Sequence, residues 1–255
     1  MTTTRQNGSL YTNIQNKIAT IEFGHPASNS LPNELLERLA KEFISVGNNE
    51  EVAIIILKSE GEKAFCAGAS FNELVAVSNL EEGKQFFSGF ANAINAMRTC
   101  GKLIIGCVQG KTVGGGVGLA AACDYVLATE HASIKLSEFT IGIGPFVIEP
   151  AVSRKIGVSG TSELTLDATS WKNAYWAKEK GLYAKVFETQ KELDEEVQVL
   201  AEKLASYNPA ALSEMKKTLW KGTENWNDLL AERAAISGEL VLSDFTKKAL
   251  QKFKK

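Results

Sequence analysis

The sequence predicts an α/β protein whose mostly buried parallel sheet is followed by a helical carboxy-terminal third. Two continuous apolar runs, 52–57 and 103–108, are typical of strands buried on both faces. The segments around them have apolar residues at a helical period, and strands that alternate with helices indicate βαβ units. After Pro150 the pattern changes to one helix after another.

The elements of the first half follow from local patterns. Apolar residues three and four apart predict a helix over 33–46, and Pro32 suits its first turn. In order, we expect a hairpin (10–14 and 18–23), that helix, a strand (52–57), a helix interrupted near Asn79 (74–97), and strands at 103–108 and 125–128.

The second half is expected to be almost entirely helical. The predicted helices cover 151–156, 161–166, 171–179, 193–206, 210–220 and 226–253, and only 184–188 has an extended pattern. We therefore divide the chain into an α/β core at residues 1–190, which contains the functional site, and a helical region at residues 191–255.

Composition excludes several classes of function. The 255 residues are 44% hydrophobic and 23% charged, with a formal net charge of −2, so no general basic field attracts nucleic acid or an anionic membrane. No apolar run approaches the ~20 residues that span a bilayer, and residues 1–7 are too polar for a signal peptide. Four cysteines without metal-ligand spacing predict free thiols in a cytoplasmic protein that binds no metal.

Two glycine-containing turns each follow an apolar run. The first is Phe65–Ala69, after the run 52–57, and the second is Gly114–Gly116, after the run 103–108. A helix that begins at glycines leaves backbone N–H groups unpaired. Two such turns can donate two hydrogen bonds to one carbonyl oxygen, which is what enolate chemistry needs.

A single carboxylate stands out downstream of these turns. Glu138 lies twenty residues after Gly118, in an apolar segment bounded by glycines. The apolar surroundings favour a catalytic role for this carboxylate. A glutamate on a surface turn is the alternative interpretation. Asp124, at the start of a predicted strand, is expected to have a structural role.

Four motifs in order resemble the crotonase superfamily, that is, the enoyl-CoA hydratase/isomerase fold. They are Asn29–Leu31, Phe65–Ser70, Gly114–Asp124 and Ala174–Leu182. The resemblance implies a crotonase-like spiral of ββα units, with the carboxy-terminal helices forming a homotrimer or a hexamer built as a dimer of trimers. It also implies an acyl-CoA thioester substrate, with no cofactor beyond the coenzyme A that the substrate contains.

The resemblance further implies roles for individual residues. The backbone N–H groups of Ala69 and Gly115 would form an oxyanion hole, and Glu138 would transfer protons. The substrate-binding positions implied by the motifs are Ala67, Ser70, Phe71, Asn72 and Gly118.

The reaction depends on how many carboxylates act. Hydratases with two carboxylates have a glutamate at the position of Gly118, so this chain keeps only Glu138. The sequence around the glycines also resembles bacterial methylglutaconyl-CoA hydratases of leucine degradation, which have glycine there. We therefore expect hydration or dehydration of a methylglutaconyl-CoA-like thioester, with isomerisation of a 3-enoyl-CoA to a 2-enoyl-CoA as the alternative.

Two further possibilities stay open. Glu149, eleven residues after Glu138, is either a second catalytic carboxylate or a group that caps a helix or pairs with Arg154. An interpretation from another class of protein is a non-catalytic module that binds acyl-CoA or RNA, although the balanced charge argues against RNA.

Overall fold

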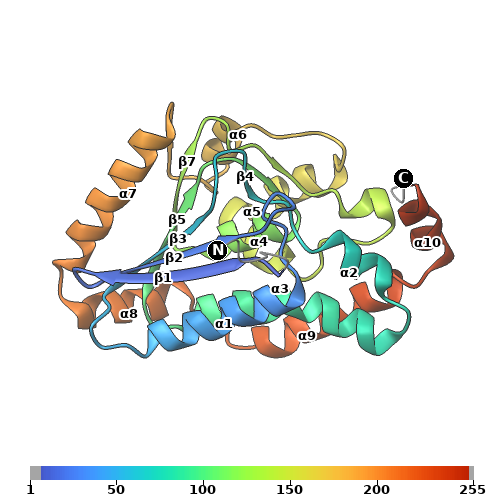
Figure 1. Cartoon of the computed structure of the whole chain (residues 1–255), viewed down its shortest axis with the longest axis horizontal. Helices are drawn as coiled ribbons and strands as arrows, with labels where there is room; N and C mark the ends of the chain where they lie inside the picture. The colour runs from blue at the N-terminus through green and yellow to red at the C-terminus, as the bar shows by residue number, and fades with distance from the viewer. Residues whose placement is uncertain (1–6, 253–255) are drawn as a thin grey trace, which may run out of the picture.

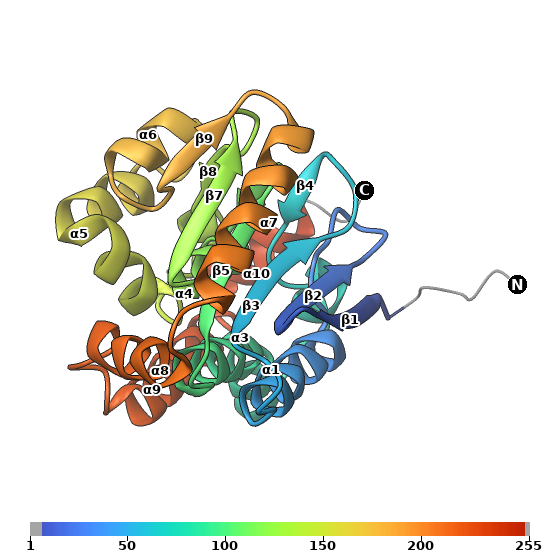
Figure 2. The same cartoon turned by 90° about the vertical axis from the view of Figure 1, so that its left-hand side faces the viewer.

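The computed structural model describes residues 7–252, and its strands form two sheets. Figures 1 and 2 show the larger sheet at the centre of the molecule, in the order β1-β2-β3-β5-β7-β9. The first two strands form the expected antiparallel hairpin, and the others are parallel. The strands are β1 (Ser9–Gln15), β2 (Ile18–Gly24), β3 (Ile54–Ser59), β5 (Leu103–Val108), β7 (Tyr125–Thr129) and β9 (Lys185–Phe187).

The smaller sheet consists of three short parallel strands. They are β4 (Ala64–Cys66), β6 (Lys111–Val113) and β8 (Ile134–Lys135), and they pair in that order. Each one directly follows a strand of the larger sheet, and helices complete each repeat. The chain therefore winds as ββα units, which confirms the spiral that the sequence resemblance implied.

Helices cover both faces of the larger sheet. One face packs against α1 (Asn33–Gly47), α3 (Leu80–Thr99) and α4 (Gly115–Ala122), and the other against α7 (Gln190–Ala205), which crosses the sheet in Figure 2. Along β3, Ile54 and Ile56 contact the α7 side, whereas Ile55 and Leu57 face the opposite core. The first helix of the expected carboxy-terminal region is thus a layer of the core.

The remaining helices match the expected pattern with two differences, at 171–179 and at 226–253. The two helices predicted at 151–156 and 161–166 are confirmed: α5 (Glu149–Leu166) is interrupted at Gly157, whose φ of +70° and ψ of 165° are not helical. The predicted helix 171–179 is shorter, because Asn173 caps α6 (Ala174–Glu179). Asn79 caps α3 after α2 (Phe71–Ala76), at the predicted interruption.

The long helix predicted at 226–253 is two helices. Following α8 (Pro209–Leu219), α9 (Trp226–Leu240) ends before a turn at which Ser243 caps α10 (Asp244–Gln251). Phe253, the predicted end of that helix, lies outside the described residues. Figure 1 shows α9 alongside α3, and α10 at the end of the molecule near α2.

Asp124 anchors α8 to the core, in agreement with its expected structural role. Its Oδ1 accepts a hydrogen bond from Trp220 Nε1 at 2.7 Å, and its Oδ2 accepts from Lys216 Nζ and from the Ile104 N–H, both at 2.7 Å. Both partners of the ion pair are almost completely buried. The start of β7 is therefore tied to β5 and to α8 by one carboxylate.

All four cysteines are buried and free. Within residues 7–252, no helix is both long enough and apolar enough to cross a membrane. The same residues contain no cluster of three or more histidine, cysteine or acidic side chains able to hold a metal ion.

The anchor gives a stability prediction. Asp124→Ala leaves the Lys216 ammonium buried and unpaired, so we expect a loss of about 3–5 kcal/mol in the free energy of unfolding, measured by urea denaturation. Glu214→Ala is the control, because it removes an exposed partner of Lys217 on the same helix and should cost at most about 1 kcal/mol. A similar loss in both variants would contradict the anchoring role.

Candidate active site

Three segments that leave the smaller sheet surround one cavity of about 180 Å³. Residues 67–69 follow β4, residues 114–115 follow β6, and residues 137–138 follow β8. Because the three strands are parallel, their carboxyl ends lie at the same edge, where ligands bind in many α/β proteins. The predicted groups Ala69, Gly115 and Glu138 are thereby brought together around a single space.

The two glycine turns approach each other closely. Gly68 and Gly114 have φ of +90° and +54°, a region that favours glycine. A Cβ atom built on Gly68 would lie 3.2 Å from the Val113 carbonyl oxygen and 3.7 Å from the Gly115 nitrogen. The first turn therefore lies directly against the beginning of α4.

The backbone N–H groups of Ala69 and Gly115 have no protein acceptor among the hydrogen bonds of residues 7–252. Their neighbours are paired: the Gly68 carbonyl accepts from Leu31 N–H, Ser70 N–H donates to the Leu31 carbonyl, and Gly114 N–H donates to the Lys135 carbonyl. Both free donors line the cavity. This arrangement can stabilise negative charge on a substrate oxygen, as an oxyanion hole does.

Glu138 begins a short 3-10 helix, η1 (Glu138–Ile141), at the wall of the cavity. Its Oε2 is buried and has no hydrogen-bond partner among the described residues. Burial raises the pKa of this carboxyl group to about 7, and the backbone N–H groups of Glu138 and Ser137 offset part of the effect. A group with that pKa can both accept and return a proton at neutral pH.

The position of Glu138 is fixed from two sides. A Cβ atom on Gly114 would lie 3.1 Å from Glu138 Oε1, so the carboxylate contacts the second glycine turn. At the other end of η1, Gly142 faces Phe245 and Thr246 of α10, which would lie 2.4 and 2.7 Å from a Cβ there. The carboxylate and the free N–H groups thus share one preorganised site.

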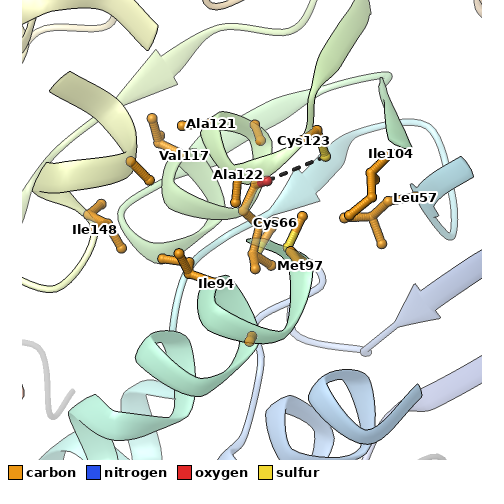
Figure 3. Packing of buried hydrophobic residues seen from close by; sticks show 14 of the residues in the cluster. Leu57, Cys66, Ile94, Met97, Ile104, Val117, Ala121, Ala122, Cys123 and Ile148 are labelled. Carbon is orange, nitrogen blue, oxygen red and sulfur yellow. Dashed lines mark hydrogen bonds between the residues drawn. The ribbon is translucent and has the colours of Figure 1, made fainter. Parts of the chain in front are cut away.

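Gly118 does not line the cavity, and the space above it is filled. A Cβ atom at Gly118 would lie 2.4 Å from Ile148 Cγ2 and 3.5 Å from Ile94 Cδ1. Figure 3 shows Ile148 and Ile94 approaching the helix that contains Val117. An isoleucine methyl group therefore occupies the space that a side chain at position 118 would enter.

The other residues predicted from sequence fall into two groups. Ala67 and Phe71 line the cavity, as expected for substrate-binding positions. Ser70 and Asn72 do not line it; Ser70 instead caps α2, its Oγ accepting from Glu73 N–H at 3.4 Å. For all four residues, a role in binding stays a prediction.

Glu149 lies at the first position of α5 and is not among the residues that line the cavity. Its Oε1 accepts a hydrogen bond from Ser153 Oγ at 2.6 Å, while Arg154 lies over the Trp220 ring. The position favours the helix-end interpretation of this carboxylate. Cys66, next to the first turn, has a pKa raised to about 12 by burial, so its thiol stays protonated.

Sequence reasoning missed much of the cavity wall. It is formed by phenylalanines of α3 (Phe86, Phe87 and Phe90), the segment 143–148 and Ser237 of α9. The phenylalanines were visible as a cluster on a predicted helix, but the same spacing also fits an ordinary core face. Ser237 lies 99 residues after Glu138 and had no sequence signal.

Comparisons with known proteins agree with this geometry. A model of the enoyl-CoA hydratase/isomerase family matches residues 13–254. The Delta(3,5)-Delta(2,4)-dienoyl-CoA isomerase of Arabidopsis thaliana is 29% identical over 211 residues, which cover 77% of this chain and 74% of that protein. The short-chain-enoyl-CoA hydratase of Clostridium acetobutylicum is 28% identical over 242 residues, which cover 94% of this chain and 92% of that protein.

Two further relatives extend the comparison. Human mitochondrial methylglutaconyl-CoA hydratase is 31% identical over 200 residues, covering 77% of this chain and 58% of that protein. The crystal structure of enoyl-CoA hydratase from Bacillus halodurans has the same fold, with a TM-score of 0.87 at 24% identity over 95% of this chain and 99% of the other. The chain belongs to the enoyl-CoA hydratase/isomerase family, and it is an enzyme of that class.

Removing the buried Glu138 carboxyl group is expected to stabilise the protein in a pH-dependent way. Glu138→Gln removes a group whose pKa rises from 4.5 to about 7 on folding, so the native state loses stability as the pH rises through this window. At pH 8 we expect the variant to be more stable by about 3 kcal/mol, at 1.36 kcal/mol for each pKa unit, and the gain to vanish below pH 4.5. Urea denaturation at several pH values measures it, with exposed Glu62→Gln as control. A gain independent of pH would refute the raised pKa.

The free N–H groups predict a spectroscopic shift. A saturated acyl-CoA labelled with carbon-13 at its thioester carbonyl should show a lower C=O stretching frequency when bound than in water, because two hydrogen bonds in an apolar cavity polarise the bond. Difference infrared spectroscopy measures the shift. A stretching frequency at or above that of the thioester in water would contradict an oxyanion hole at Ala69 and Gly115.

Proposed function

We propose that this enzyme moves the double bond of an enoyl-CoA thioester from C3 to C2 by proton transfer through Glu138. The proposal rests chiefly on one observation: Glu138 is the only ionisable side chain among the described residues that line the cavity. Hydration remains the second candidate, because the chain's relatives include proteins named as hydratases.

The reaction needs one base and one oxyanion site. The Glu138 carboxylate takes a proton from C2, and the electron pair of that C–H bond moves toward the thioester carbonyl while the C3–C4 double bond stays in conjugation. Negative charge gathers on the thioester oxygen, where Ala69 and Gly115 N–H groups donate to it. Glu138 then returns its proton to C4, and the double bond closes between C2 and C3.

The pKa of Glu138 suits both halves of this transfer. A base with a pKa of about 7 is half ionised at neutral pH, and its conjugate acid is strong enough to protonate a dienolate. Atoms and charge balance with no reagent added, so we propose that the enzyme uses no cofactor apart from the coenzyme A of its substrate.

The same geometry disfavours hydration. An ordered water usually has two to four polar partners, and a hydratase must hold and split one beside C3. Ile148 occupies the space beside Gly118, and the Glu149 carboxylate is bonded to Ser153 outside the cavity. A water in this cavity would have Glu138 as its only ionisable partner among the described residues. Hydration of a methylglutaconyl-CoA-like substrate, with a place in leucine degradation, is therefore the second candidate, after isomerisation of an enoyl-CoA.

We also propose a homotrimer, or a hexamer built from two trimers, working in the cytoplasm. Val158 and Leu166 are large apolar side chains exposed on α5. They support an assembly in which a neighbouring subunit would cover them. Light scattering during size-exclusion chromatography checks the proposal: a molar mass equal to that of one chain would refute it.

Isotope labelling tests the reaction. In heavy-oxygen water, we expect a 3-enoyl-CoA to become a 2-enoyl-CoA without oxygen-18 uptake. Mass spectrometry of the products measures the uptake. Glu138→Gln should lower turnover by about 10²–10⁴-fold, because general acid–base catalysis contributes that much, while the affinity for saturated acyl-CoA persists. A labelled 3-hydroxyacyl-CoA as the main product would instead establish hydration, and wild-type turnover by Glu138→Gln would remove Glu138 from the mechanism.

A further inference from the structure

The wall of the cavity is almost free of charge. Glu138 is its only charged side chain among residues 7–252, and Ser137 and Ser237 add the only side-chain hydroxyls. Most of the rest is apolar and includes five aromatic rings, those of Phe71, Phe86, Phe87, Phe90 and Phe146. Such a wall buries hydrocarbon favourably and offers no cation to a negatively charged group.

Ser237 comes from a place where two helices touch through their backbones. A Cβ atom on Gly83 of α3 would lie 2.8 Å from the Gly238 carbonyl oxygen, and one on Gly238 would lie 2.8 Å from the Lys84 nitrogen. This close approach of α9 to α3 brings the adjacent Ser237 to the same wall as Phe86, Phe87 and Phe90. Ser237 is 1% exposed, so a larger side chain there would have to enter the cavity or displace α9.

The hydroxyl of Ser237 already donates a hydrogen bond within α9. Its Oγ donates to the Arg233 carbonyl oxygen one turn earlier at 3.2 Å, which occupies its single proton. The Arg233 side chain is not among the described groups that line the cavity. A carboxylate at the end of an acyl chain would therefore be desolvated without a donor, and it would share the cavity with Glu138.

We propose that the cavity selects acyl-CoA thioesters with an uncharged hydrocarbon tail, and that Ser237 limits the length of that tail. This rests on the proposed function only in taking the ligand to be an acyl-CoA. It distinguishes the substrate class from thioesters of dicarboxylic acids, to which methylglutaconyl-CoA belongs.

Binding of saturated thioesters tests the charge preference, because they carry no double bond to move or hydrate. Isothermal titration calorimetry compares octanoyl-CoA with octanedioyl-CoA, which differ in the group that ends an eight-carbon chain. We expect the dissociation constant of octanedioyl-CoA to be at least ten times larger. Equal or tighter binding of octanedioyl-CoA, for example through a movement of Arg233, would overturn the proposal.

A pair of variants tests the length limit. Ser237→Leu should raise the ratio of the octanoyl-CoA to the butyryl-CoA dissociation constant by at least about tenfold, since one methylene in an apolar pocket is worth 10–200-fold. Ala235→Leu, which adds the same side chain to an exposed position of α9, should leave the ratio unchanged. Ser237→Thr is a smaller change that should also raise this ratio of dissociation constants. It replaces Ser237→Leu in the test if that variant does not fold.

The outcomes separate the two proposals. An unchanged ratio in a folded Ser237 variant would overturn the length limit, whatever reaction the enzyme performs. Failure of wild-type protein to bind either thioester would overturn both this inference and the proposed function. Discrimination in binding together with oxygen-18 uptake in turnover would support the tail preference while refuting isomerisation.

Discussion

Two backbone N–H groups must stay unpaired at the edge of a sheet whose strands are only two or three residues long. The pairing of their neighbours makes this possible. Leu31 binds the residues on both sides of Ala69, and the Lys135 carbonyl accepts from the residue before Gly115. Because these bonds hold the turns in place, both unpaired N–H groups belong to residues that line the cavity before any ligand arrives. Preorganisation of this kind is what makes an oxyanion site effective, since no reorganisation is needed during the reaction.

The same site contains the buried carboxyl group of Glu138, whose raised pKa suits proton transfer but has a cost in stability. Desolvation raises the pKa of Glu138 to about 7 and thereby reduces the stability of the native state at neutral pH. Contacts elsewhere must hold the group in this environment: Gly142 packs under Phe245 and Thr246 of α10, and α9 closes the wall through Ser237. These helices follow α8, which the buried pair of Asp124 and Lys216 ties to the core.

Much of this arrangement could be predicted from sequence, because its main signals are local. Continuous apolar runs predicted β3 and β5 and an alternating pattern predicted the β1–β2 hairpin, while the resemblance carried by four motifs implied the ββα spiral and the three groups around the cavity. The strands β4, β6 and β8 could not be recognised by periodicity, since two or three residues show no period. Tertiary contacts, such as Ile148 above Gly118, leave no local pattern at all.

Gly118 shows how one such contact changes a chemical interpretation. From sequence, the resemblance to two-carboxylate hydratases leaves only Glu138 of the two acids, and hydration by one glutamate is the first expectation. The structure fills the space beside Gly118 with a methyl group of Ile148 and leaves Glu138 as the only ionisable group of the wall among the described residues. The apolar wall also strengthens hydrogen bonds at the oxyanion site, because the local dielectric is low. The contact with Ile148 removes the space beside Gly118 that a second carboxylate would need, and it is the reason that the proposed reaction uses Glu138 alone.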